Sequence, residues 1–313
     1  LAYCFLASVL PMWTLLQPRG MLGGWFLYGA LGVAVLGIAL GGYTMQYPAF
    51  LGWSNPRGMP LFPLMFITIA CGACSGFHGL VCSGTTSKQL AKESHARGVG
   101  YGGMLLEGGV ALIALCTVVI LPLGDPGLKL DPNVLYARGL AKFASSFGIP
   151  TELAASFGLL AFATFVYDTL DVATRLGRYV LQELTGWSGR TGAFLSTGLT
   201  LGVPAGFLLT ATDKAYMKFW GVFGASNQLL AALSLLGIAV WLKRIGKPTW
   251  VALAPMSFVM VMTVWSLGLQ ARTLDAAGVT CVVLLGVAFT LVLETVRALK
   301  TTVAAQVLPA SER

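Results

Sequence analysis

Charged residues are scarce in this sequence. Asp, Glu, Lys and Arg make up 10% of the 313 residues, whereas hydrophobic residues make up 56%. Soluble domains contain about 25% charged residues. A chain of this length with so few charges could not cover a water-exposed surface. The composition therefore excludes a soluble globular protein and predicts an all-α, polytopic integral membrane protein.

Several functional signatures are also missing. The chain contains no Walker A sequence, so ATP hydrolysis by that route is not expected. Its two histidines, His78 and His95, are too few to supply the paired axial ligands of several membrane haems. No nucleophile–base constellation is recognisable. We therefore expect neither enzymatic activity nor a cofactor, and we interpret the net charge of +8 in terms of membrane orientation rather than nucleic-acid binding.

The apolar residues form nine runs that approach the length needed to cross a bilayer, about 20 residues per helix. The runs cover residues 2–17, 22–42, 61–83, 100–123, 152–173, 191–211, 215–241, 249–269 and 277–298, and the fifth continues as a helix to about 184. The longest connection, 124–151, contains a stretch at 133–146 that we expect to lie on the surface as a short amphipathic helix. The sequence predicts one transmembrane domain over residues 1–313, with about nine helices and no soluble domain.

Residues 71–88, CGACSGFHGLVCSGTTSK, continue an apolar run but are rich in glycine, hydroxyl groups and imidazole. Four glycines within residues 72–84 cost roughly 1 kcal/mol each in a helix relative to Ala, and the hydroxyls can satisfy backbone groups that a helix break exposes. We therefore predict a broken helix that lines a polar passage. The candidate substrate-binding residues in it are Ser75, His78, Ser83, Thr85 and Thr86.

The same segment presents possible soft-metal ligands on one helical face, namely Cys71, Cys74, His78 and Cys82. Ligands on one face of a straight helix cannot surround a metal tetrahedrally. We therefore predict no metal site. A metal-binding membrane protein remains an alternative, as does a sensor that transports nothing.

The fifth run places charged residues along one helical face. Thr164, Asp168, Asp171, Arg175 and Arg178 are spaced by 4, 3, 4 and 3 residues. Asp171 and Arg175 are positioned for an ion pair one turn apart, which predicts a structural role for Asp171. Asp168 lies one turn deeper and is the better candidate for coupling to a proton.

Two interpretations of this face remain. Ionisable groups inside a membrane usually mark an ion or substrate path. Alternatively, the arginines extend to the lipid headgroups and anchor the inner leaflet.

Other apolar runs contain polar residues too. Asn227 and Gln228 point to different helix faces, so one packing partner cannot satisfy both amides; they are candidates for substrate binding or for hydrogen bonding between helices. Glu107 is a lone carboxylate in the fourth run and a further candidate for ion coupling. We expect it either to pair with a basic group such as Lys88 or Arg97, or to be protonated.

Three blocks together resemble the carbon starvation protein A (CstA) family. They are SGFHGLVCSGTTSKQL at 75–90, TFVYDTLDVATRLGRYVLQEL at 164–184 and FGASNQLLAAL at 223–233, and they occur in the family's order. Cys74 and Cys82 stand where other small residues are expected in the family. The resemblance extends through most of the chain and is to the C-terminal portion of such proteins. Because the sequence opens on Leu1 rather than Met, we expect N-terminal helices of the same protein to be missing from it.

The resemblance implies a secondary transporter of the bacterial inner membrane. It implies uptake of peptides during carbon starvation or, as in close relatives, of pyruvate with protons. It also implies the architecture of the amino acid–polyamine–organocation transporters, in which broken helices surround a central site. Such folds direct half-helix N-termini at anionic groups, and the turn at Gly84 is placed to do this for a carboxylate. The expected partners are the solute, protons and the lipid bilayer.

The basic residues predict the orientation of the chain. When Lys and Arg are assigned to alternate loops, thirteen fall in one set and seven in the other. Loops rich in Lys and Arg face the cytoplasm. The larger set includes the C terminus, which we therefore place in the cytoplasm. An odd number of spans then places the N-terminal end outside.

This orientation predicts the outcome of cysteine labelling in intact cells. A membrane-impermeant reagent should modify a cysteine placed at Asp131 and spare one placed at Lys247, because the two positions belong to opposite loop sets. Modification of the cysteine at 247 together with protection of the one at 131 would reverse the orientation.

Overall fold

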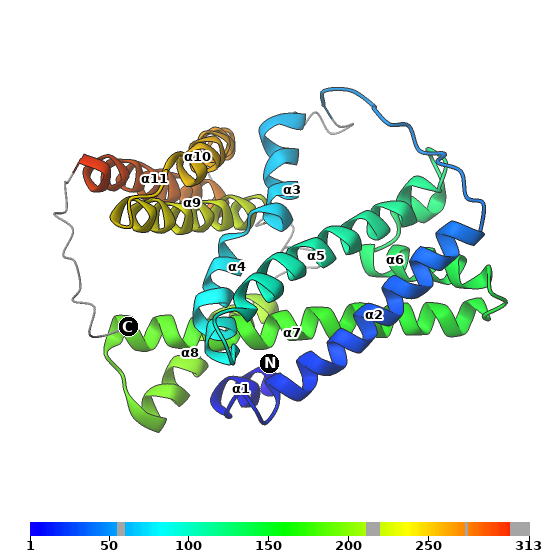
Figure 1. The fold of residues 1–313 in the computed structure, drawn as a ribbon, viewed down its shortest axis with the longest axis horizontal. Helices are drawn as coiled ribbons and strands as arrows, with labels where there is room; N and C mark the ends of the chain where they lie inside the picture. Colours follow the sequence, from blue (N-terminus) through cyan, green and yellow to red (C-terminus); the bar gives the residue numbers. More distant parts are fainter. Residues whose placement is uncertain (55–59, 211–219, 273–274, 301–313) are drawn as a thin grey trace. The chain divides into compact units, whose positions relative to one another are not determined.

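The computed structural model describes residues 1–54, 60–210, 220–272 and 275–300. In these ranges the structure is helical, and eight helices are long and apolar enough to cross a membrane (Figure 1). The α-helices are α1 (Ala2–Val9), α2 (Leu16–Leu40), α3 (Phe66–Ala73), α4 (Gly76–Val81), α5 (His95–Val119), α6 (Pro132–Ser145), α7 (Thr151–Thr185), α8 (Gly189–Thr210), α9 (Trp220–Arg244), α10 (Trp250–Gln270) and α11 (Ala276–Lys300). The chain is therefore a multi-pass membrane protein of the all-α class, as predicted.

The first predicted span differs from the structure. The helix that starts at Ala2 ends after eight residues, and Leu10 is extended with φ −69° and ψ 156°. Pro11 follows Leu10 and disfavours helical geometry in the residue before it. The run at 2–17 is thus interrupted, which accounts for eight long helices in the described residues where nine were expected.

The chain divides into two compact units, and each is described by itself. The first comprises Leu1–Phe50 and Gly84–Thr210 and contains α1, α2 and α5 to α8. The second contains Leu51–Ser83, with α3 and α4, together with α9, α10 and α11. The predicted broken segment contributes to both units, because the division falls between Ser83 and Gly84.

Helix α6 forms the core of the first unit, so the prediction that this stretch lies on the surface was wrong. It packs against α2, α5 and α7. Phe143 is fully buried and Leu140 is 1% exposed. At 14 residues the helix is roughly 21 Å long, too short to span a bilayer. The amphipathic pattern was recognised correctly, but its apolar face meets other helices rather than lipid headgroups.

Glycines allow the helices of the first unit to approach α6 closely. A Cβ atom added to Gly37 of α2 would lie 2.5 Å from the carbonyl oxygen of Phe143, and one added to Gly158 of α7 would lie 3.0 Å from Cα of Ala137. Small residues at such crossings let membrane helices gain van der Waals contact between backbones. The neighbouring helices are thereby packed directly against α6.

Helix α9 has the same position in the second unit. It packs against α3, α4, α10 and α11, and its residues Ala225, Gln228 and Ala232 are fully buried. Gly76 of α4 lies against the backbone of α9 near Ala231. The broken segment is therefore held directly on the helix that packs against all the other α-helices of its unit.

Substitution of Gly37 tests the close crossing of α2 and α6. Gly37→Ala should destabilise the protein by about 1–3 kcal/mol, because the new methyl group meets the backbone of α6. Gly32→Ala is the matched control on the same helix, because no atom lies within 4 Å of its added Cβ. Thermal unfolding in detergent should show a lower midpoint for Gly37→Ala alone. Equal midpoints for both variants would show that this crossing is not tightly packed.

Candidate functional site

The predicted break in residues 72–86 is confirmed. Helix α3 ends at Ala73, and Cys74 leaves helical geometry with φ −145° and ψ 73°. Ser75 is extended and its hydroxyl accepts a hydrogen bond from the backbone N–H of His78 as α4 begins. Residues Cys82–Thr86 form a π-helical turn. The stretch Leu61–Gln89 is one of the eight candidate membrane spans, but it consists of short helices and an irregular turn rather than one regular helix.

Asn227 of α9 satisfies the polar groups at this break. Its Oδ1 accepts a hydrogen bond of 2.7 Å from the backbone N–H of Phe77 and one of 3.2 Å from the hydroxyl of Ser75. Its Nδ2 donates to Sγ of Cys71 at 3.2 Å. The structure thus brings Ser75 and Asn227 together. In this conformation the Asn227 amide supports the broken helix itself, which was one of the two alternatives for it.

Gln228 differs from its neighbour. It is fully buried, and neither Oε1 nor Nε2 has a hydrogen-bond partner among the described residues. A buried amide without partners costs about 1–3 kcal/mol for each unsatisfied group. The partners of Asn227 therefore do not serve Gln228, and Gln228 is the amide whose hydrogen-bonding groups are unused among the described residues.

The remaining polar residues of the broken segment are divided between the units. His78 belongs to the second unit, as does Ser83, whose hydroxyl donates to the carbonyl of Leu80 at 3.1 Å. Thr85 and Thr86 belong to the first unit, where Thr85 is 2% exposed. Next to them, Gly84 lies against Leu176 of α7. The hydroxyls expected to line one passage are thus placed in two groups.

In the first unit the carboxylates of α7 pair with Arg19 of α2. Arg19 Nε lies 3.4 Å from Oδ1 of Asp168, and its Nη1 pairs with Oδ2 of Asp171. The hydroxyl of Tyr3 donates to the same Oδ2 at 3.1 Å and accepts from Arg19 at 2.6 Å. One cation, Arg19 of α2, therefore pairs with two intramembrane carboxylates of α7, and Tyr3 of α1 joins them. We call Tyr3, Arg19, Asp168 and Asp171 the Arg19 cluster.

The predicted ion pair between Asp171 and Arg175 is wrong. Arg175 instead donates from Nη2 to the backbone carbonyls of Ala7 and Leu10, the second at 2.7 Å. These carbonyls end α1, where a helix leaves acceptors without partners and its dipole favours a cation. Arg175 thus caps α1 and leaves Asp171 to Arg19.

The two carboxylates differ in access. The side chain of Asp168 is 32% exposed, whereas that of Asp171 is 1% exposed. Oδ2 of Asp168 lies against Gly23 of α2, at 2.5 Å from the position a Cβ atom would occupy. The accessible carboxylate has one long ion pair and the buried one has close contacts with two donors. Asp168, which the sequence placed one turn deeper, is thus the less buried of the two, and the separate roles stay predictions.

Sequence reasoning missed Arg19, Tyr3 and Gly23, although one signal was available. Arg19 is the only charged residue among the first 56. Next to an apolar run, such a charge needs a carboxylate or carbonyl partner from another helix. Arg19 was counted only as a loop residue, so its partners were not sought.

Glu107 belongs to α5, which contributes no residue to the Arg19 cluster. It is an exposed residue of α5. Lys88, one of its two predicted partners, places its Nζ 5.2 Å from the centre of the Tyr179 ring instead. The geometry does not join Glu107 to the other candidate coupling residues of the first unit.

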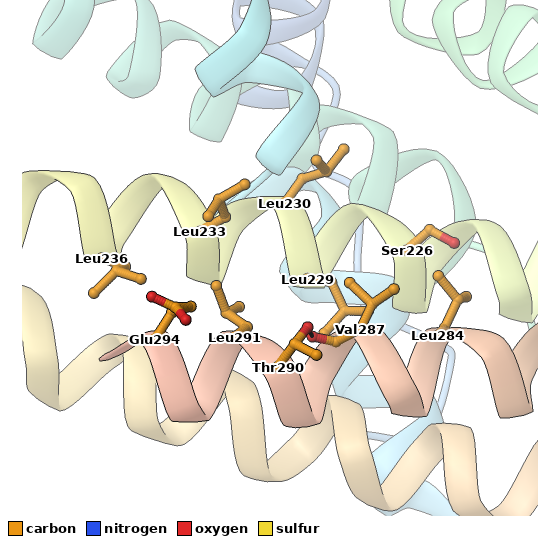
Figure 2. A pocket seen from close by; sticks show the side chains of 10 residues that line it. All are labelled: Ser226, Leu229, Leu230, Leu233, Leu236, Leu284, Val287, Thr290, Leu291 and Glu294. Carbon is orange, nitrogen blue, oxygen red and sulfur yellow. Dashed lines mark hydrogen bonds between the residues drawn. The ribbon is translucent and has the colours of Figure 1, made fainter. Parts of the chain in front are cut away.

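An apolar groove lies between α9 and α11 in the second unit (Figure 2). Its volume is about 510 Å³, and leucines such as Leu229 and Leu233 dominate its lining. The hydroxyl of Ser226 is turned back to the carbonyl of Val222 at 2.8 Å. Glu294 pairs with Arg297 at 2.8 Å. A groove with so few available polar groups does not suit a charged solute.

Comparison with known proteins reveals similarity over most of the chain. The family described as carbon starvation protein CstA matches residues 1–131 and 127–266. A peptide transporter CstA from Campylobacter jejuni is 33% identical over 86% of this chain and 48% of its own length. The Escherichia coli peptide transporter CstA is 31% identical over 83% of this chain and 47% of its own. No solved structure matches.

A pyruvate/proton symporter, BtsT of Escherichia coli, is 29% identical over 86% of this chain and 50% of its own length. The chain spans about half the length of the curated relatives it matches. These relatives are named as transporters rather than enzymes. The extent of the family match and the identity to several relatives show that the chain belongs to the carbon starvation protein CstA family.

Proposed function

We propose that this chain is part of a secondary transporter that takes up peptides or small carboxylates such as pyruvate together with protons. The Arg19 cluster is the observation that supports it best, because Asp168 and Asp171 share one cation on membrane-spanning helices. Structural ion pairs in a membrane are usually balanced, and intramembrane carboxylates usually mark ion paths. The names of the relatives, peptide transporter and pyruvate/proton symporter, agree with this function.

Asp168 is the proposed proton carrier. With both carboxylates ionised, the cluster has one negative charge more than Arg19 compensates, and a proton on Asp168 removes that excess. Asp168 is the more exposed of the two carboxylates. Asp171 keeps Arg19 and Tyr3 in place, because it is buried and contacts both. Arg175 holds α1 beside this pair through the carbonyls of Ala7 and Leu10.

The broken segment is the proposed gate for the solute. Its helical hydrogen bonding is already interrupted at Cys74 and Ser75, so a change in conformation there disrupts few further backbone bonds. Gln228 has unused hydrogen-bonding capacity in the same unit. We assign His78 and Ser83, which belong to that unit, to the lining of the solute path, in keeping with discontinuous helices in other transporters.

We place the protein in the bacterial inner membrane with its C terminus in the cytoplasm. The excess of Lys and Arg in one set of loops supports this orientation. Because α1 is too short to span, both ends of the chain then lie on the cytoplasmic side.

Asp168→Asn should uncouple transport from protons. Asn imitates a permanently protonated Asp168, so uphill uptake of pyruvate or dialanine into proteoliposomes should disappear, whereas exchange of substrate and expression should remain. Uptake is measured with and without an inward proton gradient. If the variant retains the normal dependence on the gradient, Asp168 is not the proton site.

Asp171→Asn should instead lower the yield of folded protein. It leaves Arg19 with one long ion pair in the membrane, and loss of one partner from a buried pair costs about 3–5 kcal/mol. Size-exclusion chromatography in detergent compares the monodisperse fraction with that of Asp168→Asn. A normal yield of Asp171→Asn would contradict its structural role.

Gly23→Ala tests the position of the Asp168 carboxylate without changing a charge. The added methyl group would lie 2.5 Å from Oδ2 and must displace it. Proton-driven uptake should therefore fall. Gly24→Ala on the same helix should retain uptake, because nothing lies within 4 Å of its added Cβ. Equal uptake rates in the two variants would show that coupling does not need this geometry.

A further inference from the structure

Arg178 is a buried cation without a carboxylate partner among the residues that the structure describes. It is 7% exposed, and its Nε has no hydrogen-bond partner in the described part of the chain. The groups that influence it electrostatically are Tyr179 and Arg175, and neither supplies a formal negative charge. An unpaired buried charge costs several kcal/mol. Tyr179 is hydrogen-bonded to Arg178 but carries no formal charge, so the retention of Arg178 at this depth indicates a counter-charge that the described residues do not provide.

Other cations surround the same position. The guanidinium carbon of Arg178 lies 4.7 Å from the centre of the Tyr179 ring, and Nζ of Lys88 lies 5.2 Å from the same centre. Arg175, one turn before Arg178, is 3% exposed and its Nε also lacks a partner. We call Lys88, Arg175, Arg178 and Tyr179 the Tyr179 cluster. It is basic, whereas the Arg19 cluster earlier on α7 has an excess of carboxylates.

The acidic residues nearest in the chain do not neutralise it. Asp171 is occupied by Arg19 and Tyr3. Glu183 is exposed, and the ion pairs found among the described residues do not include it. The burial of Arg178 also argues against the anchoring alternative, because an arginine that extends to lipid headgroups exposes its guanidinium.

We propose that the Tyr179 cluster binds the carboxylate group of the transported solute. Arg178 is the main ligand, since a planar guanidinium matches a carboxylate, and Lys88 adds a second positive charge from the 3-10 turn Ser87–Gln89. This inference rests on the proposed function and deepens it. A carboxylate is the group that pyruvate and the C-terminal end of a peptide have in common. One site of this kind therefore accounts for both substrate classes among the relatives.

The experiment compares an anionic ligand with its neutral analogue on the purified protein in detergent. The probes are pyruvate and pyruvamide, with tryptophan fluorescence as the readout. The wild type should bind pyruvate more tightly. Arg178→Gln should raise the Kd for pyruvate about tenfold or more, because a hydrogen bond to a charged group contributes enough binding free energy for such a change. The Kd for pyruvamide should stay the same. Arg190→Gln, the matched loss of an exposed arginine in the same unit, should bind like the wild type.

Thermal unfolding without ligand shows whether Arg178 binds a ligand or stabilises the fold. An arginine retained for a ligand destabilises the empty protein, so Arg178→Gln should have an unchanged or higher midpoint and should lose the stabilisation that pyruvate gives the wild type. A lower midpoint would show that Arg178 is structural and would overturn the proposal. Arg178→Lys should have an intermediate Kd, since it keeps the charge but not the planar fork.

Lipid is the other source of anionic oxygens. The binding measurement is therefore repeated in vesicles of phosphatidylcholine with and without phosphatidylglycerol. Pyruvate binding that stays unchanged in Arg178→Gln, together with loss of bound phosphatidylglycerol, would assign the cluster to lipid headgroups and overturn the proposal. Proteoliposome uptake keeps the two proposals apart. Binding without any uptake by the wild type would contradict only the transport function, whereas uptake with an unchanged KM in Arg178→Gln would contradict only this site.

Discussion

One arginine compensates the intramembrane carboxylates of the first unit. Arg19 provides the single cation for Asp168 and Asp171 on α7, and Tyr3 ties the short α1 to the same carboxylate. Without Arg19, neither carboxylate would have an ion-pair partner among the described residues, although Arg175 would still act on Asp171 electrostatically. In this conformation α1, α2 and α7 are therefore linked by electrostatics as well as by apolar packing.

Both interruptions of apolar runs are supported from a distant helix. The end of α1 leaves backbone carbonyls without helical partners, and Arg175 from α7 donates to those of Ala7 and Leu10. The gap between α3 and α4 exposes the N–H of Phe77, and Asn227 from α9 accepts from it. Non-helical backbone is tolerated at membrane depth only when protein or water satisfies it, so these side chains make the breaks possible.

Helix α7 carries opposite charge imbalances along its length. The Arg19 cluster has two carboxylates for one cation, whereas Arg178, farther along, has no carboxylate partner within the described ranges. The first arrangement suits a proton and the second suits an anion. Helix α7 thus carries both proposed sites, Asp168 for the proton and Arg178 for the carboxylate of the solute. The proton-coupling proposal and the solute-binding proposal therefore concern the same helix.

The sequence by itself determined the membrane class, the positions of the long helices and the break in residues 72–86, because apolar run length and glycine content are local properties. It also indicated Asp168 and Asp171, since charges stand out against apolar surroundings. Tertiary structure decided the partners: Arg19 rather than Arg175 for Asp171, and the burial of α6. An i,i+4 spacing makes an ion pair between Asp171 and Arg175 possible. Packing nevertheless brings Arg19, 152 residues away in the sequence, into contact with Asp171 instead. Amphipathic periodicity likewise defines an apolar face without saying whether protein or membrane covers it.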